Sequence, residues 1–134
     1  ADIANAALAG GVAIGATCAH ATHTSAFIIG ALGGALSVIG YTLIQPRLQK
    51  LIKGIDTCGV HNLHGMPGLL GGLATLFVVQ GLSKGIQIKG ILITILIALV
   101  TGLATGTVLS LLGYRKDSYE DAEEFIVGEH GTQH

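Results

Sequence analysis

The chain contains 134 residues, of which half are hydrophobic and only 11% are charged, and its mean hydropathy is +0.67. These values lie outside the usual range of soluble domains, whose helices need a polar outer face. The formal net charge is −1, so the composition offers no basic surface of the kind that binds nucleic acid. The composition therefore indicates an integral membrane protein.

Four apolar segments, separated by the few charged residues, follow one another along the chain. They cover approximately residues 3–18, 26–45, 63–81 and 90–113, and a helix needs about 20 apolar residues to span a bilayer. Residues 1–116 are therefore predicted to form an all-α, polytopic membrane bundle of four transmembrane helices, followed by a cytoplasmic tail at 117–134. The chain starts at Ala1 without an initiator Met or signal peptide, so we expect it to be part of a longer polypeptide.

Every apolar segment contains a Gly-x-x-x-Gly pair. In lipid the hydrophobic effect does not drive helices together, so small residues that let backbones approach closely supply the packing. Helix packing is therefore predicted at Gly11, Gly15, Gly30, Gly34, Gly68, Gly72, Gly102 and Gly106.

Helix-terminating residues lie at or just after the ends of three segments. Pro46 is predicted to stop the second helix, and Gly81 and Gly113 are placed as C-terminal glycines of the third and fourth.

Basic residues predict the orientation, because Lys and Arg are enriched in cytoplasmic loops. Five lie after the second and fourth segments and two lie between the third and fourth: Arg47, Lys50, Lys53, Arg115 and Lys116, against Lys84 and Lys89. The loop 46–62 and the tail are thus predicted to face the cytoplasm from a cell membrane.

The most informative stretch runs from Asp56 to Gly68, at the cytoplasmic start of the third segment. Polar side chains within a span are costly and normally face a bundle interior or an aqueous cavity. His61 and His64 are three residues apart, which predicts that they share one helical face. They could form a metal pair, hydrogen-bond between helices, or line a conduction path. A closed metal site needs further ligands, and the nearby candidate is Asp56 alone, so we favour the conduction path.

The run Asp-Thr-Cys-Gly-x-x-Asn-Leu-His-Gly-x-Pro-Gly, which starts at Asp56, resembles the signature of Rhesus-type (Rh) ammonia channels of the ammonium transporter superfamily. The run Asn-Ala-Ala-Leu-Ala-Gly-Gly-Val-Ala-Ile-Gly, which starts at Asn5, is similar to another segment of that family. The stretch from Tyr119 to Ala122 in the tail also resembles a family feature. The resemblance implies that the chain matches helices eight to eleven, the C-terminal part, of the eleven-helix ammonium-transporter fold.

On this resemblance, His64 matches the second member of a twin-histidine pair that lines the pore. His61, Asn62, Leu63 and Met66 are expected to line the same passage. His61 lies one turn away from His64 and either adds an imidazole to the inner vestibule or keeps a polar contact.

Three further residues of the two matching runs are expected to have vestibule or structural roles: Asp56, Thr57 and Asn5. Asp56 either accepts backbone N–H bonds and orders the vestibule wall, or only caps the helix.

The family's pore lies within each subunit between two inverted halves, and the subunits form trimers. The resemblance therefore implies the N-terminal half of the same channel, further copies of the subunit and the lipid bilayer as partners. The implied function is facilitated passage of ammonia or ammonium, with methylamine and carbon dioxide as further candidates, and no cofactor, metal or enzymatic activity is expected. An ammonium-binding sensor or regulatory membrane subunit, and an enzyme with a histidine metal centre, are the alternatives.

Overall fold

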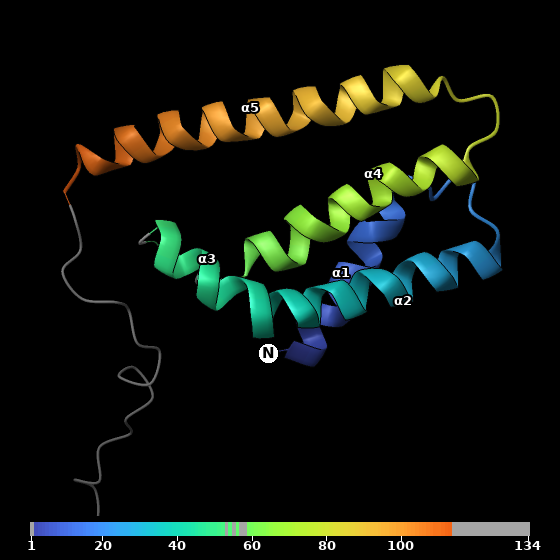
Figure 1. The fold of residues 1–134 in the computed structure, drawn as a ribbon, viewed down its shortest axis with the longest axis horizontal. Coiled ribbons are helices and arrows are strands. Elements are labelled where there is room, and N and C mark those ends of the chain that lie inside the picture. Colours follow the sequence, from blue (N-terminus) through green and yellow to red (C-terminus); the bar gives the residue numbers. More distant parts are fainter. Residues whose placement is uncertain (1, 53, 55, 57–58, 114–134) are drawn as a thin grey trace, which may run out of the picture. The chain divides into compact units, whose positions relative to one another are not determined.

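The computed structural model describes residues 2–52, 54, 56 and 59–113. The elements within these residues are helical. In chain order they are α1 (Asp2–Gly15), α2 (His23–Ile39), the π-helical turn η1 (Gly40–Ile44), α3 (Gln45–Ile52), the π-helical turn η2 (His61–Gly65), α4 (Met66–Val78) and α5 (Lys84–Ser110), and Figure 1 labels the α-helices. The predicted all-α fold class is confirmed. The chain divides into two compact units, one ending at Leu96 and the other beginning at Ile97.

Helices α2 and α3 form one continuous helix of 30 residues, because η1 joins them without a break. The helix starts where the Thr22 hydroxyl accepts a hydrogen bond from the Ser25 N–H at 3.2 Å, which is the usual N-cap arrangement. The predicted stop at Pro46 is wrong, since the helix continues through Pro46 to Ile52. A proline ring in an α-helix clashes with the carbonyl four residues earlier. That carbonyl belongs here to the π turn η1, whose wider hydrogen-bond spacing accommodates the ring.

Other helix boundaries also differ from the predicted ones. The third predicted segment, 63–81, is helical from His61 to Val78, and the fourth, 90–113, is helical from Lys84 to Ser110. Gly81 and Gly113 have positive φ angles of 73° and 99°, as expected of glycines that follow helix ends. The predicted tail 117–134 lies outside the described residues.

Within the described residues, two helices are long and apolar enough to cross a membrane: His23–Ile52 and Lys84–Ser110. Helix α1 is apolar but shorter, and the helix from η2 through α4 starts with the polar residues His61, Asn62 and His64. Four membrane crossings therefore stay a prediction for this chain.

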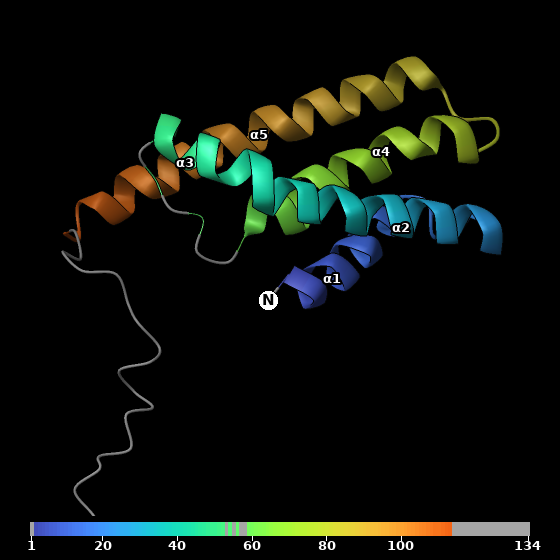
Figure 2. The same cartoon turned by 60° about the horizontal axis from the view of Figure 1, so that its bottom comes forward.

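The first unit is held together by α1, α2 and α4, each of which contacts the other two, and both views of the ribbon show α1 lying against α2 (Figures 1 and 2). Ala9 and Ala13 of α1 are fully buried in this contact. A Cβ placed on Gly33 of α2 would lie 2.6 Å from the Ala13 Cβ, and one placed on Gly71 of α4 would overlap the Ala13 carbonyl oxygen. The three helices therefore meet almost backbone to backbone, as small residues allow in lipid.

The glycines at these contacts are only partly the predicted ones. Gly34 packs against α1, because a Cβ there would lie 3.0 Å from the Ala6 carbonyl oxygen, whereas Gly10, Gly33 and Gly71 lie outside the predicted pairs. A Cβ on Gly30, Gly68 or Gly72 would meet neighbouring side chains at ordinary van der Waals distances: 3.8 Å from Ile14, 3.9 Å from Val12 and 3.4 Å from Ile91. Among the described residues no atom lies within 4 Å of a Cβ on Gly11 or Gly15. Packing roles for Gly11, Gly15 and, in the second unit, for Gly102 and Gly106 stay predictions.

Candidate functional site

The helix that carries both histidines begins at the carboxylate of Asp56. The backbone N–H groups of Val60 and His61 donate hydrogen bonds to Asp56 Oδ1 and Oδ2, at 2.8 and 3.0 Å. The first N–H groups of a helix have no intrahelical partner, and negative charge is favourable at this end. Asp56 therefore caps the helix. Both roles predicted for it include such bonds to backbone N–H groups, so the choice between a vestibule role and a cap alone stays open.

The histidines lie in the π turn η2, in which the N–H of Met66 donates to the carbonyl of His61. The α-helical spacing that predicted a shared face for His61 and His64 does not apply in such a turn, because its hydrogen bonds span five residues instead of four. The His64 side chain is exposed, whereas His61 is half-buried. Single π turns within α-helices occur frequently at functional sites, so η2 is the first place to examine for function.

Asn62 is the most enclosed polar residue of this turn, with an exposed fraction of 0%. Its Nδ2 donates to Gln45 Oε1 at 2.5 Å, and its Oδ1 lies 3.3 Å from His61 Nδ1. Gln45 in turn donates from Nε2 to the carbonyl oxygen of Asp56 at 3.0 Å. The pore-lining role predicted for Asn62 does not match this placement, since its side chain lies inside the bundle and joins η2 to the start of α3.

Gly40 makes room for this network at the end of α2. A Cβ there would overlap both Asn62 Oδ1 and Met66 Cε. The Met66 side chain, one of the predicted pore-lining groups, thus reaches toward Gly40 and is half-buried. The two π turns therefore meet at a position where any side chain larger than that of glycine would separate them.

A second polar contact lies next to the cap. Asn5 Nδ2 donates to the Tyr41 hydroxyl at 2.8 Å, and this hydroxyl occupies the space that a Cβ on Gly59 would need. Gly59 has a φ of +64°, which residues with a side chain rarely adopt. Asn5 thus joins α1 to η1 through this hydrogen bond, while its vestibule or structural role stays a prediction, and Thr57 lies outside the described residues.

The open part of the turn consists of His64, which is exposed, and Leu63, which is half-exposed. The His64 ring has no hydrogen-bond partner among the described residues, in contrast to Asn62 and the cap. In the same part of the chain, no three His, Cys, Asp or Glu side chains converge as a metal site requires. The pore-lining roles of His61, Leu63, His64 and Met66 stay predictions.

Four residues that position the turn were not predicted from the sequence: Gln45, Tyr41, Gly40 and Gly59. Gln45 is a polar residue at the end of an apolar run, and this was the one local signal that it had a partner, because lone polar groups within a span are costly.

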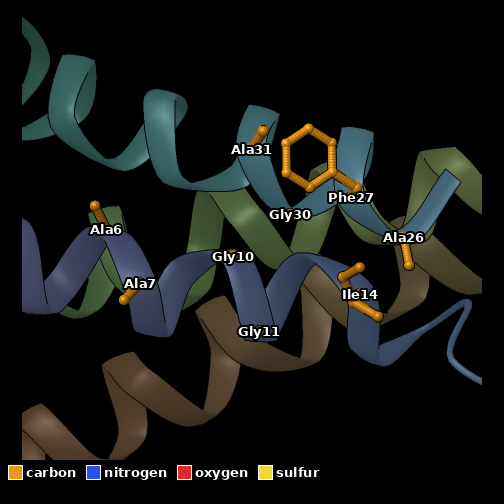
Figure 3. Close-up of a pocket in the computed structure, with 9 residues that line it drawn as sticks. All are labelled: Ala6, Ala7, Gly10, Gly11, Ile14, Ala26, Phe27, Gly30 and Ala31. Atoms are coloured by element: carbon orange, nitrogen blue, oxygen red, sulfur yellow. The ribbon is translucent and has the colours of Figure 1, made fainter. Parts of the chain in front are cut away.

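A groove between α1 and α2 is the other candidate, with a volume of about 480 Å³. Figure 3 shows that its walls carry only alanine, glycine, Ile14 and Phe27 side chains: Ala6, Ala7, Gly10, Gly11, Ile14, Ala26, Phe27, Gly30 and Ala31. A polar or charged ligand needs hydrogen-bond partners when it leaves water, and these side chains provide none. The polar turn η2 is therefore the stronger candidate.

Comparisons with known proteins agree on one family, that of the ammonium transporters. The profile described as Ammonium Transporter Family matches residues 1–134. The chain is 41% identical to the ammonium transporter Rh type A of Bos taurus, over 95% of this chain and 32% of the relative. It is 39% identical to the ammonium transporter Rh type B of Oryctolagus cuniculus, over 98% of this chain and 35% of the relative.

A solved structure is also similar. It is that of Rh50 from Nitrosomonas europaea, described with the mechanism of conduction by the Rhesus protein family of channels. Its TM-score is 0.82 and its sequence identity 53%, and the match covers 94% of this chain and 33% of that one. The chain thus spans about a third of the length of the relatives that it matches.

Proposed function

The chain belongs to the ammonium transporter family, and on this premise we propose that it supplies part of a membrane channel through which ammonia passes. The family is one of transporters and channels, not of enzymes, and its membership makes this chain a membrane protein. The relatives are named as ammonium transporters and, for Rh50, as a channel protein, which supports passage over a sensor that only binds ammonium.

The exposed His64 ring carries the proposal. It lies on η2, where the neighbouring Asn62 and the Asp56 cap are satisfied by hydrogen bonds within the chain, while the ring itself has no partner among the described residues. A neutral imidazole offers one donor and one acceptor. It therefore fits a passing ammonia molecule, which both donates and accepts hydrogen bonds.

Physical chemistry favours the neutral gas over the ion. An ammonium ion that enters a narrow apolar passage loses hydration worth at least several kcal/mol, whereas ammonia loses far less. The half-exposed Leu63 next to His64 and the half-buried Met66 are the proposed apolar walls. We propose that His64 exchanges hydrogen bonds with ammonia in a passage from which these walls exclude most water, and that methylamine or carbon dioxide uses the same route.

The remaining walls come from outside this chain in our proposal. His64 lies on an open face, and the relatives are about three times as long as the matched part. The N-terminal half of the same channel covers this face, and three copies of the subunit assemble in the cell membrane. The end of the unit that carries α3, with Arg47 and Lys50, faces the cytoplasm.

The test is ammonia uptake by stopped-flow fluorescence in proteoliposomes that contain the complete protein. Loss of a hydrogen bond worth about 1 kcal/mol corresponds to a rate lower by about fivefold, so His64→Ala is expected to lower the flux by about this factor. The matched control is His23→Ala, which removes an exposed imidazole at the start of α2. Unchanged flux in His64→Ala would count against the pore role, and absent flux in the unaltered protein would favour the sensor.

A further inference from the structure

The continuous helix from His23 to Ile52 is longer than the apolar layer of a membrane. Its 30 residues extend over ~45 Å, whereas the hydrocarbon of a bilayer is about 30 Å thick and the two headgroup layers together add about 10–15 Å. The uncharged run 26–45 has the length of the hydrocarbon layer. In a membrane-spanning position, α3 at the end of this helix therefore lies at the depth of the lipid headgroups.

Helix α3 has an apolar groove on one side. The groove has a volume of about 270 Å³, and among the described residues only those of this one helix line it: Ile44, Arg47, Leu48 and Leu51. Their spacing of i, i+3, i+4 and i+7 is that of a single helix face. Leu51 is 80% exposed, and no residue of α3 is buried. The helix thus presents an open apolar surface at headgroup depth.

Arg47 provides a positive charge at this groove. Its Nη1 donates a hydrogen bond to the Leu43 carbonyl oxygen at 2.9 Å, which holds the guanidinium beside the helix. Its other N–H groups have no partner among the described residues, and a guanidinium presents such groups as a fork that matches two oxygens of a phosphate. Lys50, one turn further along the helix, adds a second exposed cation.

The charges near the groove favour an anionic ligand. No Asp or Glu lies between positions 2 and 56 of the sequence. The Asp56 carboxylate already accepts hydrogen bonds from the backbone N–H groups of Val60 and His61. Within the described part of α3, a ligand at Arg47 therefore meets cationic and apolar side chains together.

We propose that this surface binds an anionic phospholipid of the membrane. Arg47 binds the phosphate with the support of Lys50, and the acyl chain lies along Ile44, Leu48 and Leu51. The depth of α3 brings the guanidinium to the layer of the phosphates, and Ile44 lies at the edge of the hydrocarbon, where a lipid chain joins its headgroup. A soluble phosphate ester has no apolar part for this surface, and a zwitterionic lipid lacks the net negative charge that the two cations attract.

The test is native mass spectrometry of the complete protein in detergent, titrated separately with dioleoyl phosphatidylglycerol and dioleoyl phosphatidylcholine. The unaltered protein is expected to bind phosphatidylglycerol more tightly. A Lys or Arg near an anionic headgroup contributes about fivefold to the affinity. Arg47→Gln should therefore raise the Kd for phosphatidylglycerol by about this factor and leave that for phosphatidylcholine nearly unchanged. Arg47→Lys, which keeps the charge and loses the fork, should give an intermediate Kd.

Lys84→Gln is the matched control, because it removes one exposed cation outside the groove, at the start of α5. The Kd for phosphatidylglycerol should not change in this variant. Leu51→Ser tests the apolar part of the groove and should raise the same Kd by about twofold or more. Since Leu51 is exposed, the unfolding temperature of the protein should stay the same.

Equal affinity of the unaltered protein for the two lipids would overturn the proposal. So would an unchanged Kd for phosphatidylglycerol in Arg47→Gln, which is the result expected where a second copy or another segment of the protein covers the groove. Glycerol phosphate that binds as tightly as the lipid would also overturn it, because the groove would then contribute nothing. Ammonia takes no part in these titrations, so an absent ammonia flux would refute the proposed function and leave the lipid site standing.

Discussion

The carbonyl oxygen of Ala13 in α1 occupies the space that a side chain on Gly71 in α4 would need. This contact brings α4, and with it the turn that carries His64, against the rest of the first unit. Its atoms are backbone atoms, which cannot move aside as the end of a flexible side chain can. The position of α4, and of η2 directly before it, therefore depends on a glycine at position 71.

Gly71→Ala is accordingly expected to destabilise the protein by about 1–3 kcal/mol, the range for overpacked cores. The measurement is thermal unfolding of the complete protein in detergent. The control is the adjacent substitution Gly72→Ala, whose Cβ would meet the flexible Ile91 side chain at 3.4 Å. Equal unfolding temperatures for the two variants would show that the α1–α4 contact is looser than described.

Gly59 and Gly81 provide a second matched pair, because both have positive φ angles, 64° and 73°. Ala at either position bears the cost of a left-handed backbone, about 1–2 kcal/mol. At Gly59 the new Cβ would also overlap the Tyr41 hydroxyl, whereas at Gly81 it would meet nothing within 4 Å among the described residues. We therefore expect Gly59→Ala to lower the unfolding temperature more than Gly81→Ala. An equal drop in unfolding temperature for both variants would mean that the Tyr41 side chain moves away from the new Cβ without destabilising the protein.

Asp56 is expected to contribute to helix stability through its two hydrogen bonds to the backbone N–H groups of Val60 and His61. Replacing an N-cap carboxylate by alanine typically costs about 0.5–2 kcal/mol. Asp56→Ala should therefore speed hydrogen exchange of these two N–H groups by up to about thirtyfold, while Asp56→Asn, which keeps one acceptor oxygen, should have a smaller effect. Exchange rates that do not change in Asp56→Ala would rule out this capping role.

The hydrogen bond from Asn5 to Tyr41 can be measured by a double-mutant cycle. Asn5→Ala and Tyr41→Phe each remove one partner, and a part-buried hydrogen bond contributes about 0.5–1.5 kcal/mol. We expect a coupling free energy in this range from the unfolding of the two single variants and the double variant. Additive effects would mean that the 2.8 Å contact contributes nothing to the joining of α1 and η1.

The features predicted correctly from the sequence were those set by local composition. Long uncharged runs predict membrane helices whatever their partners are, and the specific run from Asp56 to Gly68 predicted the family through its resemblance. The hydrogen bonds of Asp56 to backbone N–H groups, which both of its predicted roles include, also have a local physical reason, since an acidic residue is favourable at a helix start.

The features that were missed depend on contacts between distant residues. The helix continues through Pro46 because η1 precedes it, and η1 lies where Gly40 meets Asn62 and Met66. No local pattern distinguishes such a π turn from an α-helical turn. For the same reason the packing glycines were partly misplaced: which glycine of a run faces a neighbour depends on how the helices cross, and here Gly10 rather than Gly11 faces α2.

The central claim is that the exposed face of η2 borders a passage shared with residues outside this chain. An experimental structure of the complete protein in lipid tests it most directly. We predict that the His64 ring lies beside a narrow cavity that is continuous with both aqueous sides and lined by apolar side chains. A His64 ring that faces lipid, or one packed against protein with no cavity beside it, would contradict the account.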